Sequence, residues 1–294
     1  MYERLLIAVD GSEEARRAAR RGLGLAAAFD ASVDVVSVVE QKALRLTESG
    51  SEKSRVRDRG EAALAEIETL ASDLGIAVTT ELVEGTPAVE IGAYADARGA
   101  DLIVVGRQGL TGIGRRLLGG VTEQVLHRSD VPVLVVSGGG EAGDYARVLL
   151  TTDGSDNAEV AIPHGTAIAR RFDSEVHVVN VVDLQSAGGL FDAGGLEAEF
   201  VERLEARGQE AVDAMGRQLE EAEGDLDVRT AVERTSSFEG AAAGIREYVA
   251  AEGIDLVVMG SHGRSNLGRQ LLGSVASTVL RTVDVPVLVV KRPG

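Results

Sequence analysis

Glycine-containing segments in both halves of the sequence have the residue types that bind phosphate. In the second half Gly260, Gly263 and the pair Gly273-Ser274 follow the apolar run IDLVV, in a stretch that otherwise favours a helix. A glycine loop that leads into a helix presents backbone N–H groups and the positive end of the helix dipole. The spacing G-x2-G-x9-G-S therefore predicts a phosphate site, although such glycines could also serve only to turn the chain.

An aspartate ends the first apolar run of each half. Asp10 and Asp153 are both followed by Gly-Ser, which is typical of the start of a helix. A carboxylate repels phosphate but accepts hydrogen bonds from ribose hydroxyls, so we favour a ligand role over helix capping alone. Together the features predict a nucleotide whose sugar lies near Asp153 and whose phosphates lie over Gly273-Ser274. The phosphate-loop lysine motif and the dinucleotide pattern G-x-G-x-x-G are both absent.

The composition excludes several other classes of function. The 294 residues carry a net charge of −17, which argues against nucleic-acid binding because phosphate backbones attract basic patches. The absence of cysteine excludes disulfides and thiolate chemistry, and the four histidines lack metal-ligand spacing. No apolar run approaches the roughly 20 residues of a membrane helix, and the opening MYERLLIAVDGS does not fit a signal peptide. We therefore expect an acidic, cytoplasmic protein with no membrane or nucleic-acid partner.

The sequence repeats itself. Residues 4–40 match 147–183 at an offset of 143, and residues 100–136 match 254–290 at an offset of 154. The difference of 11 residues predicts an insertion in the second half, largely around 184–200.

Each half is expected to form one domain, 1–137 and 145–294, and a glycine-rich linker at 138–144 joins them. Short runs of Val, Ile and Leu alternate with helical stretches, which predicts α/β domains with doubly wound, mostly parallel five-stranded sheets. Ligands bind such sheets at the carboxyl ends of the strands, where the strand order reverses. In the first half the expected strands are 4–10, 32–40, 77–85, 100–106 and 131–136, and the expected helices are 12–29, 55–75, 87–99 and 116–129.

The run VPVLVV closes both halves, at 131–136 and 285–290. As an apolar edge strand it would need cover, so we expect the two domains to pack as a pseudo-dimer through these strands. The sequence leaves open a further dimer of two chains.

The combination of G-x2-G-x9-G-[S/T], an aspartate after the first strand and a closing VPVLVV strand resembles the universal stress protein family. The resemblance covers both halves almost end to end, so the chain is similar to a tandem two-domain member. It implies a five-stranded α/β sheet of the flavodoxin or Rossmann type. It also implies adenine-nucleotide binding, which one subgroup of the family shows, and dimerisation through the last strand.

In the second half the resemblance implies a complete nucleotide site. Asp153 would bind the ribose, and the backbone of Val181 would contact adenine. The phosphate loop would consist of Gly260, Gly263, Gly273, Ser274 and Val275. The corresponding residues of the first half are Asp10, Val38, Gly106, Gly109, Gly119, Gly120 and Val121.

The first site departs from the family pattern at Gly120, which replaces the serine or threonine and removes a hydroxyl donor. Thr122 is expected to compensate in part, and Arg107 is a further candidate phosphate partner. We therefore expect the first site to be weaker than the second. Five other residues could either contact phosphate or face solvent: Arg115, Arg116, Arg264, Arg269 and His262.

Three functions are compatible with these residues. The first is an ATP-binding stress-response or signalling module without efficient catalysis, with AMP or another adenine nucleotide as alternative ligands and Mg²⁺ bridging the phosphates. The second is a slow ATP hydrolase, although the motif supplies no second carboxylate or base beside the phosphates. The third is a scaffold for an unknown protein partner, with one or both nucleotide pockets vestigial.

Overall fold

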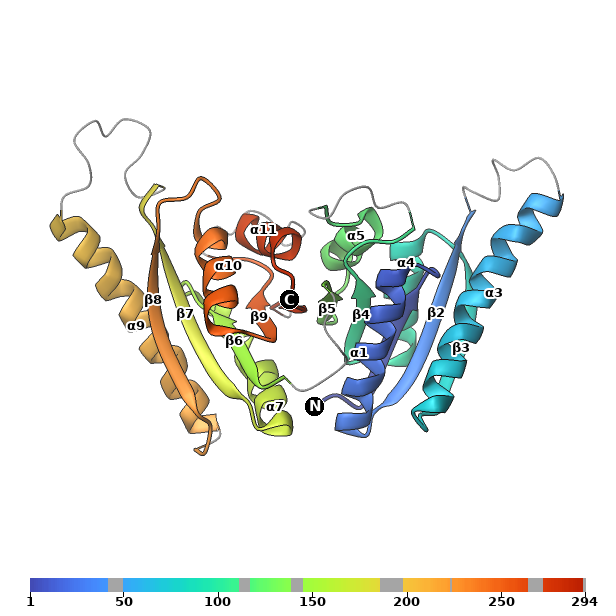
Figure 1. Cartoon of the computed structure of the whole chain (residues 1–294), viewed down its shortest axis with the longest axis horizontal. Coiled ribbons are helices and arrows are strands. Elements are labelled where there is room, and N and C mark those ends of the chain that lie inside the picture. The colour runs from blue at the N-terminus through green and yellow to red at the C-terminus, as the bar shows by residue number, and fades with distance from the viewer. Residues whose placement is uncertain are drawn as a thin grey trace. The chain divides into compact units, whose positions relative to one another are not determined.

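The computed structural model divides the chain into two compact units, Met1–Gly143 and Asp144–Gly294. Each unit contains five parallel strands with helices on both faces (Figure 1). The expected linker at 138–144 lies outside the described residues apart from Gly138. The structure describes residues 1–41, 50–110, 117–138, 145–185, 198–222, 224–263 and 272–292.

In the first unit the strands follow the order β3-β2-β1-β4-β5, with parallel pairing throughout. These strands are β1 Arg4–Val9, β2 Ser32–Glu40, β3 Val78–Gly85, β4 Leu102–Gly106 and β5 Val133–Val136. The central strands β1 and β4 are almost entirely buried, as expected for valine- and leucine-rich strands that helices cover on both faces. The chain reverses its direction of winding between β1 and β4, where such a sheet opens a crevice at its carboxyl edge.

Helices cover both faces of this sheet. Within the described residues they are α1 Glu13–Phe29, α3 Gly50–Asp73, α4 Pro87–Arg98 and α5 Gly120–Arg128. Helices α1 and α3 contact each other on one face, and α4 and α5 contact each other on the other. Helix α5 begins later than the expected residue 116, because Gly119 has an extended backbone with φ −66° and ψ 142°.

The second unit repeats the arrangement in the order β8-β7-β6-β9-β10. Its strands are β6 Arg147–Thr151, β7 Glu175–Asp183, β8 Val228–Thr235, β9 Leu256–Gly260 and β10 Val287–Val290. Its helices within the described residues are α6 Asp156–Glu159, α7 Ile162–Phe172, α9 Ala198–Ala222, α10 Ala241–Glu252 and α11 Ser274–Thr282. The expected tandem of doubly wound, parallel α/β sheets is confirmed. Pairing of the two VPVLVV strands stays a prediction.

The helix after the first strand differs between the units. Helix α1 is continuous, whereas the second unit has the short α6 and then α7. Pro163 stands in the first turn of α7, and proline has no N–H to donate to the carbonyl of Glu159. The interruption therefore follows from one residue, which takes the place of Arg20 in the first half.

The 11 additional residues of the second half fall in two places. Strand β7 is the equivalent of β2 and begins 143 residues after it. The equivalent of β3 is β8, at an offset of 150, and the equivalent of α4 is α10, at an offset of 154. Seven of the additional residues therefore lie between β7 and β8, in the region that the sequence indicates. The other four lie between β8 and α10, where residues 236–240 replace the single Thr86.

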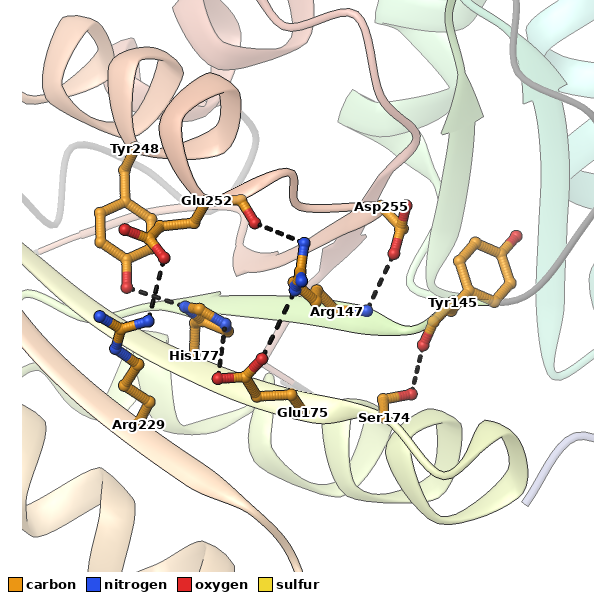
Figure 2. A network of polar contacts seen from close by, with 9 residues as sticks. All are labelled: Tyr145, Arg147, Ser174, Glu175, His177, Arg229, Tyr248, Glu252 and Asp255. Carbon is orange, nitrogen blue, oxygen red and sulfur yellow. Dashed lines mark hydrogen bonds and ion pairs between the residues drawn. The ribbon is translucent and has the colours of Figure 1, made fainter.

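A polar network lies at the amino end of the second sheet (Figure 2). His177 on β7 is fully buried, and its Nδ1 lies 2.8 Å from the hydroxyl of Tyr248 on α10. Its Nε2 lies 3.4 Å from Glu175 Oε1, and Arg147 Nε lies 3.5 Å from the other oxygen of Glu175. The network is at the edge opposite the glycine loops, so His177 serves the packing of the sheet.

The first unit places a carboxylate at the equivalent position. Asp34 on β2 is 1% exposed, and its two oxygens lie 3.0 Å from Arg4 Nη1 and 2.5 Å from Arg98 Nη2. The paired arginines compensate the cost of burying this charge. The two units therefore keep a polar group at the same place in the sheet and satisfy it with different chemistry.

Burial lowers the pKa of the His164 imidazole on α7 from 6.5 to about 4. Between these values the unfolded chain binds a proton that the folded unit does not, so the free energy of unfolding should fall as the pH is lowered from about 6.5 to 4. We expect an NMR titration to show a midpoint near pH 4 for the His164 imidazole, and this midpoint should be missing in His164→Gln. A midpoint near 6.5 for His164 would contradict this burial.

Candidate functional site

A tight turn follows the first strand of each unit, and an aspartate stands where the carboxyl end of the strand meets this turn. Asp10 Oδ1 accepts a hydrogen bond from the Ser12 amide at 3.0 Å, and Asp153 Oδ1 accepts one from the Ser155 amide at 3.1 Å. The glycine between the aspartate and the serine is Gly11 in the first unit, with φ +81°, and Gly154 in the second, with φ +75°. A residue with a side chain rarely adopts such a positive φ. The D-G-S sequence therefore fixes one carboxylate oxygen and leaves the other to face the neighbouring loop.

The serines of the two turns act differently. The Ser12 hydroxyl accepts a hydrogen bond from the Ala15 amide at 3.1 Å, so Ser12 caps α1. The Ser155 hydroxyl instead donates to Asp153 Oδ1 at 2.5 Å. In the first unit the capping role thus belongs to the serine and not to the aspartate.

The second glycine of each loop lies directly against this carboxylate. A Cβ at Gly109 would stand 2.3 Å from Asp10 Oδ2, and one at Gly263 would stand 2.5 Å from Asp153 Oδ2. The Leu110 amide also donates to Asp10 Oδ2 at 2.9 Å. The structure therefore brings together the aspartate and the glycine loop that the sequence singles out, in both units.

The first and third glycines of the loop are also in close contact with backbone. A Cβ at Gly260 would lie 2.1 Å from the Asn157 carbonyl oxygen, and one at Gly106 would lie 3.0 Å from the Glu14 carbonyl carbon. The Gly273 amide donates to the Ser261 carbonyl at 2.8 Å, and Gly119 makes the same bond to Arg107. This bond returns the chain to the start of the loop just before α11 or α5 begins.

The starts of α5 and α11 face outward. Gly119 and Gly273 are the N-cap residues, and glycine has no side chain with which to cap the first amides. The next two residues of each helix are exposed, namely Gly120 and Val121 in the first unit and Ser274 and Val275 in the second. Uncapped amides at the positive end of a helix dipole are suited to an anion.

The residues expected near adenine lie beside the aspartates. Strand β2 runs parallel to β1 with Ser37 opposite Val9, so Val38 is next to Asp10. In the second unit the Thr152 amide donates to the Val179 carbonyl at 2.9 Å, which places Val181 near Asp153. Both Val38 and Val181 are half-buried.

Two candidate residues of the first site are buried, and their roles toward phosphate stay predictions. The Thr122 hydroxyl donates to the Gly106 carbonyl at 2.8 Å, so it already has a backbone partner. Arg107 is 5% exposed, so the structure does not present it at the surface of the loop.

In the second unit the His262 Nδ1 lies 2.8 Å from the Ser261 hydroxyl. The other four candidate arginines, Arg115, Arg116, Arg264 and Arg269, lie outside the described residues.

The sequence analysis missed the residue four positions after each aspartate. Glu14 Oε2 accepts a hydrogen bond from the Gln108 amide at 2.6 Å, so a second carboxylate does contact the loop of the first unit. Asn157 occupies this position in the second unit and donates to the Gly263 carbonyl at 3.2 Å. Asp10 and Asp153 precede the first helical residue of their units, so no helical spacing links them to Glu14 and Asn157, and the sequence carries no signal for these contacts.

Two findings bear on metals and membranes. In the part of the chain that the structure describes, no three His, Asp or Glu side chains come together to hold a metal ion. None of the helices among the same residues has the length and apolar character needed to cross a membrane.

The fold and the loops define a duplicated, doubly wound α/β protein with a glycine loop against a strand-end aspartate in each half. Residues 1–137 and 144–291 match the Universal stress protein family. The chain therefore belongs to the universal stress protein family, as its sequence motifs indicate.

Relatives extend over both units. A universal stress protein of Mycolicibacterium smegmatis is 30% identical over 300 residues, which cover 98% of this chain and 96% of that protein. The crystal structure of a universal stress protein from Archaeoglobus fulgidus matches with a TM-score of 0.72 at 23% identity, covering 98% of this chain and 96% of its own. A universal stress protein solved in complex with cAMP is 30% identical, with a TM-score of 0.38, and covers 46% of this chain and 97% of its own.

Proposed function

We propose that the chain is a nucleotide-binding module of the stress response, which binds an adenine nucleotide, foremost ATP, without efficient catalysis. The observation that carries the proposal is the contact between a strand-end carboxylate and a glycine loop that precedes a helix whose N-cap residue is a glycine. Such an edge offers acceptors for ribose hydroxyls beside donors for phosphate. Membership of the universal stress protein family supports the same ligand class.

The second unit has a more complete set of groups for binding a nucleotide than the first. Asp153 would accept from the ribose, and the amides and hydroxyl at Gly273-Ser274 would donate to phosphate. The backbone near Val181 would meet adenine. Mg²⁺ would bridge the phosphates, a role in which the ion keeps most of its water ligands and needs few protein ligands.

Catalysis is poorly supported. Phosphoryl transfer needs a positioned metal and a group that orients the nucleophile. At the second unit the position equivalent to Glu14 holds the neutral Asn157, and at the first unit Glu14 accepts a hydrogen bond from a backbone amide. A slow hydrolase is therefore the second candidate, and a scaffold whose pockets are vestigial is the third.

Calorimetric titration with ATP and Mg²⁺ tests the proposal. We expect saturable binding that Asp153→Ala weakens strongly, because the ribose would lose its acceptor. Release of phosphate should stay far below the roughly 1–100 per second of kinases. Turnover in that range would establish the hydrolase instead, and absence of binding to the intact, folded chain would favour the scaffold.

The hydroxyl of Ser274 should make the second site tighter. A hydrogen bond to a charged acceptor contributes about 1.5–3 kcal/mol, or roughly tenfold to hundredfold in affinity. Ser274→Gly should weaken ATP binding by this factor. Gly120→Ser should tighten the first site, since among the described residues no atom lies within 4 Å of a Cβ added there.

Each of these variants is titrated in a background where Asp10→Ala or Asp153→Ala blocks the other site. Equal affinity of the two unmodified sites, or an unchanged affinity after Ser274→Gly, would show that this hydroxyl does not distinguish them.

A further inference from the structure

The glycine loop of the first unit carries an internal anion. Glu14 Oε2 lies 2.6 Å from the Gln108 nitrogen, between the first and second glycines of the loop. Asp10 Oδ2 accepts from the Leu110 amide at 2.9 Å, just beyond the second glycine. Two carboxylates of the same chain therefore bind the two amides that flank Gly109. The Glu14 side chain is only 20% exposed, and its other oxygen, Oε1, lies 3.9 Å from Nη2 of the more exposed Arg17, so the carboxylate stays ionised beside the loop.

The second unit replaces this anion with a neutral side chain. Asn157 is equivalent to Glu14, and its amide group donates to the Gly263 carbonyl at 3.2 Å. Asn157 therefore holds the loop through a carbonyl oxygen and adds no negative charge beside it. Both loops keep the three glycines of the motif, but the side chain that contacts the loop from the first helical turn is the charged Glu14 in one unit and the neutral Asn157 in the other.

A carboxylate at a loop amide competes with phosphate in two ways. It accepts the hydrogen bond that a phosphate oxygen would take, and it repels the phosphate charge at short range. An uncharged ligand such as adenosine would feel neither effect, because its ribose and base would lie toward Asp10 and Val38. The loss of binding affinity that Glu14 causes should thus grow with the number of phosphates on the ligand.

We propose that Glu14 determines ligand selectivity at the first unit. With Glu14 in place the first unit discriminates against the polyphosphate and binds adenosine at least as tightly as ATP. The second unit, with Asn157, binds ATP more tightly than adenosine. This inference rests on the proposed function and adds to it a division of ligands between the two halves of one chain.

The decisive variant is Glu14→Gln, which keeps an oxygen acceptor for the Gln108 amide and removes the charge. It is made together with Asp153→Ala, and the dissociation constants of ATP and adenosine are measured by calorimetry. We expect the affinity for ATP to rise by about tenfold or more, since the affected bond involves a charged group. The affinity for adenosine should change by less than about twofold.

A matched control separates local contact from overall charge. Glu13 also lies in the first turn of α1, but its side chain is 71% exposed and pairs with Arg16 at 2.8 Å. Glu13→Gln removes the same charge without touching the loop, so it should leave the ratio of ATP to adenosine affinity nearly unchanged. In the second unit Asn157→Asp should lower the affinity for ATP and spare adenosine, with circular dichroism checking that the variant folds.

The outcomes are distinguishable. The inference is supported if Glu14→Gln shifts the ratio of ATP affinity to adenosine affinity and Glu13→Gln does not. Provided that the second unit still binds ATP, three results would overturn the inference. The ratio of ATP to adenosine affinity could stay unchanged on Glu14→Gln, or both affinities could change equally. The third result is a first unit that binds neither ligand in any variant. If neither unit binds ATP or adenosine, the proposed function fails, and the inference fails with it.

Discussion

The arrangement of each unit depends on the contact between a carboxylate at the end of one strand and a glycine α-carbon after the neighbouring strand. In both units an added Cβ would stand 2.5 Å or less from the aspartate oxygen, so only glycine allows the loop to lie there. The turn D-G-S fixes the aspartate, because its other oxygen is bonded to the serine amide. The loop then returns, through one backbone bond, to the start of the helix that would hold phosphate. A strand order that reverses beside the first strand is what brings these segments to one edge.

Duplication preserved this framework while side chains around it changed. The strands keep their order and parallel register, yet the buried position filled by Asp34 in one sheet is filled by His177 in the other. At the ligand edge the differences are concentrated at a few positions, where Glu14 stands against Asn157 and Gly120 against Ser274. Each change alters hydrogen bonding or charge next to the loop and leaves the three motif glycines of each unit in place. Two halves with one fold can therefore differ in the ligands that they favour.

The sequence was sufficient for the fold and for the backbone of the site. Buried valine runs, D-G-S turns and the glycine spacing are local patterns with one dominant physical cause each, and they predicted the sheets and an aspartate and a glycine loop at the same edge of each sheet. The start of α5 and the interruption at Pro163 depend on the backbone of single residues; the first was predicted too early, and the second was not predicted. Long-range side-chain contacts were missed. Neither the bond from Glu14 to the Gln108 amide nor the inward turn of the Thr122 hydroxyl follows from spacing along the chain.

The most direct test of the central claim is a crystal structure of the chain grown with ATP and Mg²⁺. The account predicts that the ribose hydroxyls of a nucleotide at the second unit lie within hydrogen-bonding distance of the Asp153 carboxylate. Its phosphates should accept from the amides and hydroxyl at Gly273-Ser274. A nucleotide bound with its phosphates at the aspartate, or bound elsewhere on the chain while this edge stays unchanged, would contradict the account.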